Sequence, residues 1–168
     1  LMYGKVRAGK GTIARILERL IGKECYMGTS LDDLAGDFGL DGLERSRVIC
    51  ISEVSELDGK DGERCTRVLK NIVGQDPITV NIKFQRQIRN VVVNAAPMMQ
   101  TNEIPMLPNK GRGLSSKMLL LPFDRTFEGK EDPDLLEKLE KELTGIAAWV
   151  VKGSQKVEAC KDSSRRFP

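Results

Sequence analysis

The most distinctive chemistry in the sequence lies in residues 4–12, which carry the spacing Gly4-x4-Gly9-Lys10 followed by Gly11-Thr12. In loops of this type, backbone N–H groups surround phosphate oxygens, the lysine reaches the β and γ phosphates, and the next helix presents its positive end. The residue after the lysine is usually the Ser or Thr that holds Mg²⁺. Here it is Gly11, which leaves Mg²⁺ ligation by Thr12 open. A tight glycine turn without a ligand is the other interpretation, but an apolar stub before and a helix pattern after favour a phosphate site.

A nucleotide hydrolase also needs an acidic residue after a neighbouring buried strand, where it holds Mg²⁺ or polarises the attacking water. Glu53 follows the apolar run 48–51, and Glu56 is the alternative three residues later. An ordinary solvated carboxylate is the other interpretation of Glu53. A polar residue that touches the γ-phosphate would follow another strand. Asn94 and Asn102 both stand in an Asn-x-x-Pro sequence, and spacing alone does not distinguish them.

Basic residues accompany a segment that alternates apolar and polar side chains over 78–84. Lys83 lies on its polar side, with Arg86 and Arg89 close behind. A basic hairpin of this kind can follow a phosphate backbone, although a solvated edge strand protected by lysine is an equally good interpretation. A second basic group precedes the next apolar segment and on its own indicates only a solvated loop: Lys110, Arg112 and Lys117.

The composition limits the classes of function. The chain has 168 residues, of which 40% are hydrophobic and 30% charged, and this suits one globular domain with a buried core. The absence of His excludes Ser-His triads and most catalytic zinc sites. A net charge of +3 permits a nucleic-acid partner without requiring one. The four cysteines lack CxxC spacing and predict reduced thiols of a cytosolic protein. No apolar run is long enough to predict a membrane helix, and no signal-peptide pattern is recognisable. The sequence pattern at Leu1 begins inside a secondary-structure element, so we expect an N-terminal portion to precede it.

Strand patterns alternate with helix patterns, which predicts an α/β fold with a mainly parallel sheet. Amphipathic spacing predicts a helix over 13–21 that ends at Gly22 and a second over 65–73 that ends at Gly74. Short helical pieces over 30–44 would begin at Thr29 or Ser30. The alternating segment would return as an exposed hairpin whose second arm covers about 88–93.

The second half is predicted to be less regular. Prolines indicate a loop-rich stretch around Met98-Met99, followed by another buried strand over 118–121. Asp132-Pro133 predicts the start of a helix with Leu135, Leu136, Leu139 and Leu143 inward, which Gly145 separates from a last helix. We therefore expect a core over 1–127, a C-terminal helical part of the same domain over 128–160, and a polar tail over 161–168.

Several sequence fragments occur in a characteristic order. They are Gly4 to Thr12, the segment that ends in Glu53, Leu69 to Val80 leading to Lys83-Phe84, Thr101-Asn102-Glu103-Ile104-Pro105, Ser115-Ser116-Lys117-Met118, Leu121-Pro122-Phe123 and Phe127 to Asp132. This order resembles the superfamily 3 helicases, in particular the ATPase region of phage and plasmid primase-helicases related to the poxvirus type. The resemblance spans nearly the whole chain.

The resemblance implies a P-loop NTPase with an AAA+-like sheet that binds ATP and Mg²⁺. It implies that Asn102 is the γ-phosphate sensor, that Glu53 activates water, and that Lys83, with Arg86 nearby, contacts single-stranded DNA. The family has an arginine finger at the position that Lys117 occupies here. This sequence departs from the family at that position, because lysine offers a point charge rather than a planar fork. Arg112 is the alternative finger. It further implies a homo-hexamer in the full-length protein, in the cytoplasm of a bacterial host or virus-infected cell.

Two other classes of function remain open at the level of sequence. A nucleoside monophosphate kinase also carries Gly-Lys-Gly-Thr, but would need a basic lid and a second nucleotide pocket. A degenerate module that binds nucleotide and DNA without catalysis is compatible with Gly11 and Lys117.

Overall fold

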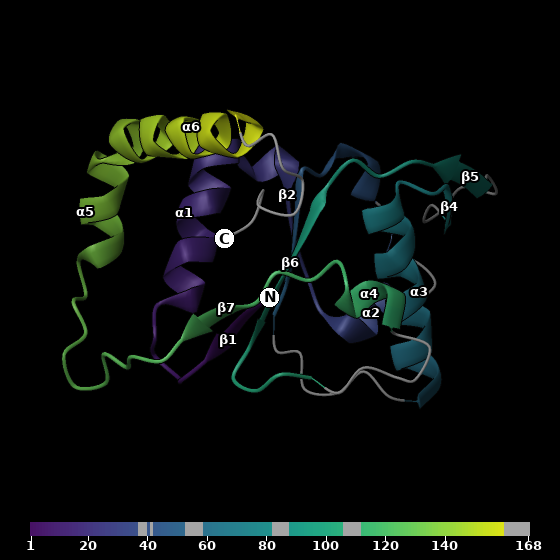
Figure 1. Cartoon of the computed structure of the whole chain (residues 1–168), viewed down its shortest axis with the longest axis horizontal. Helices are drawn as coiled ribbons and strands as arrows, with labels where there is room; N and C mark the ends of the chain where they lie inside the picture. The colour runs from purple at the N-terminus through teal and green to yellow at the C-terminus, as the bar shows by residue number, and fades with distance from the viewer. Residues whose placement is uncertain (37–39, 41, 53–58, 82–87, 106–111, 160–168) are drawn as a thin grey trace.

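The computed structural model of the chain describes residues 1–36, 40, 42–52, 59–81, 88–105 and 112–159 (Figure 1). A five-stranded sheet in the order β2-β3-β6-β1-β7 forms the centre, and every neighbouring pair in it is parallel. Its strands are β1 (Met2–Gly4), β2 (Tyr26–Thr29), β3 (Val48–Ile51), β6 (Ala96–Thr101) and β7 (Leu121–Phe123). The predicted α/β fold with a mainly parallel sheet is therefore confirmed.

Helices cover both faces of this sheet. Figure 1 shows α1 (Lys10–Ile21), α5 (Leu135–Lys141) and α6 (Leu143–Ala159) on one side, and α2 (Leu31–Ala35), α3 (Gly59–Gly74) and α4 (Arg112–Ser115) on the other. Two 3₁₀ turns, Lys23–Cys25 and Leu43–Arg45, precede β2 and β3. No helix within the described ranges combines the length and apolar character needed to cross a bilayer.

The core lies between the sheet and the α2–α3 side. α3 buries the face that the sequence predicted, because apolar residues spaced three and four apart lie on one side of a helix. Both faces of β3 are buried, as expected for a strand inside a parallel sheet. The largest fully buried side chains are Leu34, Leu43, Ile49, Ile51, Leu69, Ile72, Val80, Val93 and Cys65.

The predicted hairpin is also present. β4 (Ile78–Asn81) pairs with β5 (Ile88–Val91) in an antiparallel ladder outside the main sheet. Ile78 and Val80 are buried whereas Thr79 is exposed, so the alternation in the sequence marks the two faces of the strand. The hairpin packs its apolar face on the core and presents its polar face to solvent.

The strands of the second half differ most from the predictions. The stretch predicted as a loop around Met98-Met99 is β6, which pairs with both β3 and β1. The strand predicted as buried over 118–121 is β7, which begins at Leu121 and lies at the edge of the sheet with Leu121 45% exposed. β2 was not predicted at all, because Tyr26-Met27-Gly28-Thr29 has neither alternation nor a continuous apolar run.

The helix boundaries need smaller corrections. Ser30 caps α2, as predicted. Gly74 is the last helical residue of α3, and Gln75 takes the left-handed conformation, with φ 57°, that Gly74 was expected to provide. α5 begins at Leu135, two residues beyond the proline that was predicted to start it. The break between α5 and α6 comes at Glu142, whereas Gly145, the predicted break, lies inside α6. Of the leucines predicted to face inward, Leu136, Leu139 and Leu143 are half-buried and Leu135 is 39% exposed.

Candidate nucleotide-binding site

The phosphate-loop sequence joins the end of β1 to the start of α1. Gly9 precedes the helix with φ 90°, a conformation that glycine adopts without strain, and Lys10 is the first helical residue. No side chain caps the N-terminus of α1 and its first turn has no acidic residue. The positive end of this twelve-residue helix therefore faces the loop without a negative side chain in its own first turn to neutralise it.

The Lys10 ammonium lies at the centre of the site. Its Nζ donates to the carbonyl oxygens of Gly4 at 2.7 Å and Lys5 at 2.8 Å, and to Oδ1 of Asn102 at 3.1 Å. Only 9% of Lys10 is exposed, and this burial lowers its pKa below the usual 10.5. Within the described part of the chain these acceptors are all neutral, and a buried cation in such surroundings is well suited to an anionic partner.

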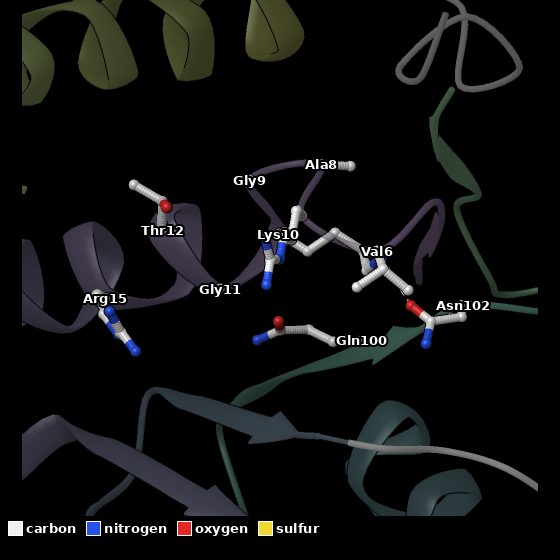
Figure 2. Close-up of a pocket in the computed structure, with 10 residues that line it drawn as sticks. Val6, Ala8, Gly9, Lys10, Gly11, Thr12, Arg15, Gln100 and Asn102 are labelled. Atoms are coloured by element: carbon white, nitrogen blue, oxygen red, sulfur yellow. Dashed lines mark hydrogen bonds between the residues drawn. The ribbon is translucent and has the colours of Figure 1, made fainter. Parts of the chain in front are cut away.

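An open pocket surrounds the loop, with a volume of about 300 Å³ (Figure 2). Its lining comes from the loop, the first turns of α1 and the carboxyl end of β6: Val6, Arg7, Ala8, Gly9, Lys10, Gly11, Thr12, Arg15, Gln100 and Asn102. Because parallel strands end at the same edge of a sheet, the residues after β1 and β6 meet there.

The backbone of the loop fits a phosphate group. Lys5 N–H donates to the Phe123 carbonyl and Ile13 N–H to the Gly9 carbonyl. Between them, none of the N–H groups of residues 6–12 donates to a backbone acceptor in the described ranges. Such groups are available to phosphate oxygens. A Mg²⁺ ion has fewer partners: Thr12 lines the pocket, but the described residues contain no cluster of three Asp, Glu, Cys or His side chains.

The structure brings together most of the residues predicted to bind nucleotide, and it distinguishes the two asparagines. Asn102 directly follows the carboxyl end of β6, where it accepts the hydrogen bond from Lys10. Asn94 precedes the other end of this six-residue strand, so about 20 Å of strand separates the two positions.

The remaining predicted residues do not join this cluster. Lys117 is exposed and precedes β7, so it lies toward the edge of the sheet opposite the phosphate loop. Glu53 and its alternative Glu56 are outside the described residues, as are the predicted DNA-contacting residues Lys83 and Arg86.

Sequence reasoning did not single out three polar residues of the pocket, Arg7, Arg15 and Gln100. Gln100 stands two residues before Asn102 on β6, and side chains two apart on a strand share a face; recognition of the strand would have predicted it. Its Nε2 donates to Sγ of Cys50 on β3 at 3.0 Å. The pKa of Tyr26 on β2 is raised by burial, which has the larger effect, and by a hydrogen bond with Cys50. A polar row thus extends from the pocket across the α1 side of the sheet.

Comparison with known families gives a match to a model described as a family of unknown function, DUF5906, over residues 2–114. The chain belongs to this family. The part that matches DUF5906 includes the phosphate loop, the hairpin and Asn102, and it ends before Lys117. No curated protein matches the chain.

Solved structures with similar folds include two apo forms of the NrS-1 C-terminal region, with TM-scores of 0.68 and 0.63 at 16% and 17% identity over 87% of this chain. JCV helicase with a bound small molecule has a TM-score of 0.55 at 18% identity over 84% of this chain. The chain spans 34–40% of the length of these structures. At this identity the likeness establishes a helicase-like fold.

Proposed function

We propose that this chain is the ATPase motor domain of a replicative DNA helicase of the superfamily 3 type, as found in phage and plasmid primase-helicases. The observation that carries the proposal is the contact between Lys10 and Asn102, at the carboxyl edge of a parallel sheet in a helicase-like fold. A phosphate-loop lysine beside a polar residue from the neighbouring strand is an arrangement suited to a γ-phosphate and its attacking water.

In this proposal the N–H groups of the loop and the α1 N-terminus bind the phosphates of ATP, and Lys10 moves from its carbonyl acceptors to the β and γ oxygens. Asn102 contacts the γ-phosphate and orients the attacking water, while Glu53 accepts the proton from that water. Thr12 and Glu53 would hold Mg²⁺, which supplies neutralisation of the phosphate charge.

Binding of single-stranded DNA is assigned to Lys83 and Arg86, whose positions in the sequence fall between the end of β4 and the start of β5. Lys117 lies away from the phosphate loop of its own chain, which supports a role across a subunit boundary in a homo-hexamer of the longer protein. We propose a cytoplasmic location in a bacterial host or a virus-infected cell for that protein.

The test is ATP hydrolysis by the purified chain with and without single-stranded DNA, together with its elution size in ATP and Mg²⁺. We expect turnover that DNA stimulates, and loss of at least about 100-fold in Lys10→Ala because a positioned donor is removed. Lys152→Ala, which changes an exposed lysine of α6, is the matched control. Hydrolysis by Lys10→Ala at the wild-type rate would refute the proposal.

A non-catalytic module that binds nucleotide and DNA is the second candidate, favoured by Gly11 at the usual Ser/Thr position and by Lys117 at the finger position. ATP binding by the wild-type chain without hydrolysis, in the presence of DNA and at concentrations that favour assembly, would favour this candidate over the motor.

A further inference from the structure

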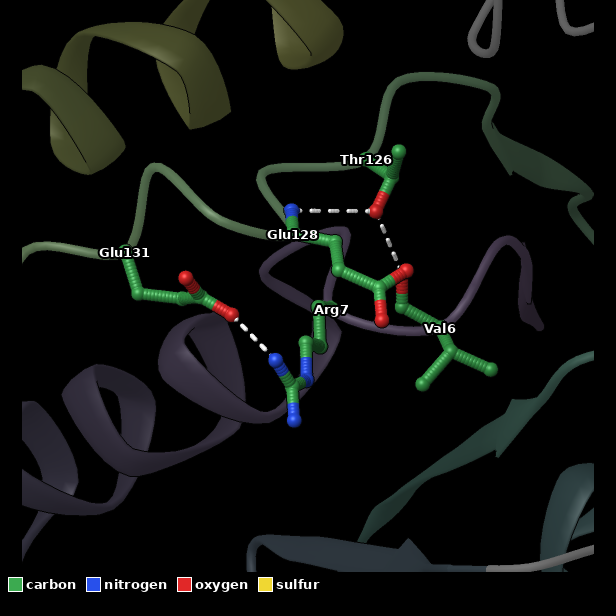
Figure 3. A network of polar contacts seen from close by, with 5 residues as sticks. All are labelled: Val6, Arg7, Thr126, Glu128 and Glu131. Atoms are coloured by element: carbon green, nitrogen blue, oxygen red, sulfur yellow. Dashed lines mark hydrogen bonds and ion pairs between the residues drawn. The ribbon is translucent and has the colours of Figure 1, made fainter.

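The segment of residues 126–131, here called the strap, follows β7 and passes along the outside of the phosphate loop (Figure 3). Two hydrogen bonds connect the strap to the loop backbone. The Thr126 hydroxyl donates to the Val6 carbonyl at 3.0 Å, and the Phe127 N–H donates to the Arg7 carbonyl at 3.1 Å. The Arg7 guanidinium also pairs with the Glu131 carboxylate. The strap lies beyond the part of the chain that matches the family model.

These two hydrogen bonds determine the direction of two donors in the loop. In a trans peptide, the C=O and the N–H of the next residue point in opposite directions, and the described chain has no cis peptide bond. A Val6 carbonyl held by Thr126 therefore directs the Arg7 N–H away from the strap. By the same geometry, an Arg7 carbonyl held by Phe127 directs the Ala8 N–H away from it. Neither N–H has a backbone acceptor within the described ranges.

The conformation of Arg7 shows that the loop is under constraint at this point. Arg7 has φ 55°, a left-handed conformation that is unfavourable for a residue with a side chain. Such a conformation persists where the surroundings determine it. Here the Arg7 carbonyl is held by Phe127 and its side chain by Glu131.

The strap is itself anchored at its C-terminal end. Asp132, the next residue, accepts hydrogen bonds from the Asp134 N–H at 3.0 Å and from Lys138 Nζ at 2.6 Å in α5. The hydrogen bond from Lys138, as the larger effect, and that from the Asp134 N–H lower the pKa of Asp132. The strap therefore spans the interval between the phosphate loop and the C-terminal helices.

We propose that the strap positions the phosphate loop for nucleotide binding, with Thr126 as its main side chain. This inference rests on the proposed function, because it concerns the same phosphate site. Thr126 is a positioning residue that acts through the Val6–Arg7 peptide and touches no phosphate. The Arg7–Glu131 pair contributes less, since its side chains are 56% and 44% exposed and water screens such pairs.

The test is equilibrium binding of a fluorescent ATP analogue with Mg²⁺ to the full chain, measured by anisotropy. Thr126→Val removes the hydroxyl while it keeps the shape, and should weaken binding roughly three- to tenfold, the range of one neutral hydrogen bond. Thr126→Ser keeps the hydroxyl and should restore binding to within about twofold of wild type. The matched control is Thr79→Val, which removes an exposed hydroxyl bonded to Asn90 in the hairpin.

The melting temperature of each variant without nucleotide separates positioning from folding. Weaker binding by Thr126→Val alone, with a melting temperature like that of Thr79→Val, supports the strap. Binding by Thr126→Val that equals wild type overturns the strap and leaves the proposed function intact. Failure of Thr126→Ser to restore binding also overturns it, because the hydroxyl would then not be the cause. A wild-type chain that binds no nucleotide overturns both proposals.

Discussion

Gly4, the last residue of β1, is the glycine among the described residues whose added Cβ would come nearest to backbone atoms. Its φ is 133°, outside the range that residues with a side chain adopt readily. A Cβ at this position would lie 2.4 Å from the carbonyl oxygen and 2.8 Å from the carbonyl carbon of Phe123 in β7. Both are backbone atoms, so neither can move aside without displacement of the strand.

The cost of Gly4→Ala has two parts. Backbone strain at a φ of this kind costs of order 1–3 kcal/mol. Displacement of β7 also breaks the hydrogen bond from Lys5 N–H to the Phe123 carbonyl, worth about 0.5–1.5 kcal/mol. We therefore expect the free energy of unfolding to fall by about 2–4 kcal/mol, a large share of the stability of a domain this size.

The matched control is Gly9→Ala in the same loop. Gly9 has a φ of 90°, but an added Cβ would have no atom within 4 Å among the described residues. Its cost should be strain alone, about 1–2 kcal/mol. Urea unfolding followed by far-ultraviolet circular dichroism gives both values, with an unchanged m-value as the check that the unfolded states are comparable. If Gly4→Ala costs no more than Gly9→Ala, the close approach of β1 and β7 is not what requires glycine at position 4.

Two further predictions concern buried polar groups. Burial lowers the pKa of Lys10 below 10.5, so its charge destabilises the folded state at neutral pH, and this penalty disappears as the pH rises from the folded pKa towards 10.5. The free energy of unfolding of the wild type minus that of Lys10→Met, both measured by urea titration, should therefore increase with pH over that interval. A difference that does not change with pH would contradict the argument. Thr66 is 3% exposed and its hydroxyl has no hydrogen-bond partner in the part of the chain that the structure describes, so Thr66→Val should raise the melting temperature, with a gain of about 1 kcal/mol in stability. A lower melting temperature would show that the hydroxyl has a partner.

The features predicted correctly from the sequence are those encoded over short distances. The strand–loop–helix conformation of residues 2–21 follows from glycine spacing, and α1 and α3 follow from apolar residues three and four apart. β3 follows from a continuous apolar run. Period-two alternation gives β4, and with the turn residues after it the hairpin. In each case neighbouring side chains fix the conformation of their own segment, so a local pattern is sufficient.

The position of β6 was not predictable in this way. Ala96–Thr101 contains a proline and two methionines and has no clear alternation, yet it lies at the centre of the sheet between β3 and β1. Its pairing depends on backbone hydrogen bonds with strands far away in the sequence, and such bonds leave no signature in side-chain type. β7 was misjudged for the complementary reason, because apolar composition does not reveal that a strand lies at an edge.

The sequence by itself determined which residues can do chemistry: a phosphate loop with Lys10, and two asparagines that spacing does not distinguish, of which the family resemblance favours Asn102. Only the tertiary structure shows a contact with Lys10, because Asn102 is 92 residues away in the chain and reaches it through the parallel pairing of β1 with β6. The contact of the strap with the loop depends even more on the tertiary structure, since the Thr126 hydroxyl donates to the carbonyl of Val6, 120 residues away in the chain. Contacts at such separations arise from the order of strands in the sheet, which is set by packing of the whole core rather than by any local pattern of residues.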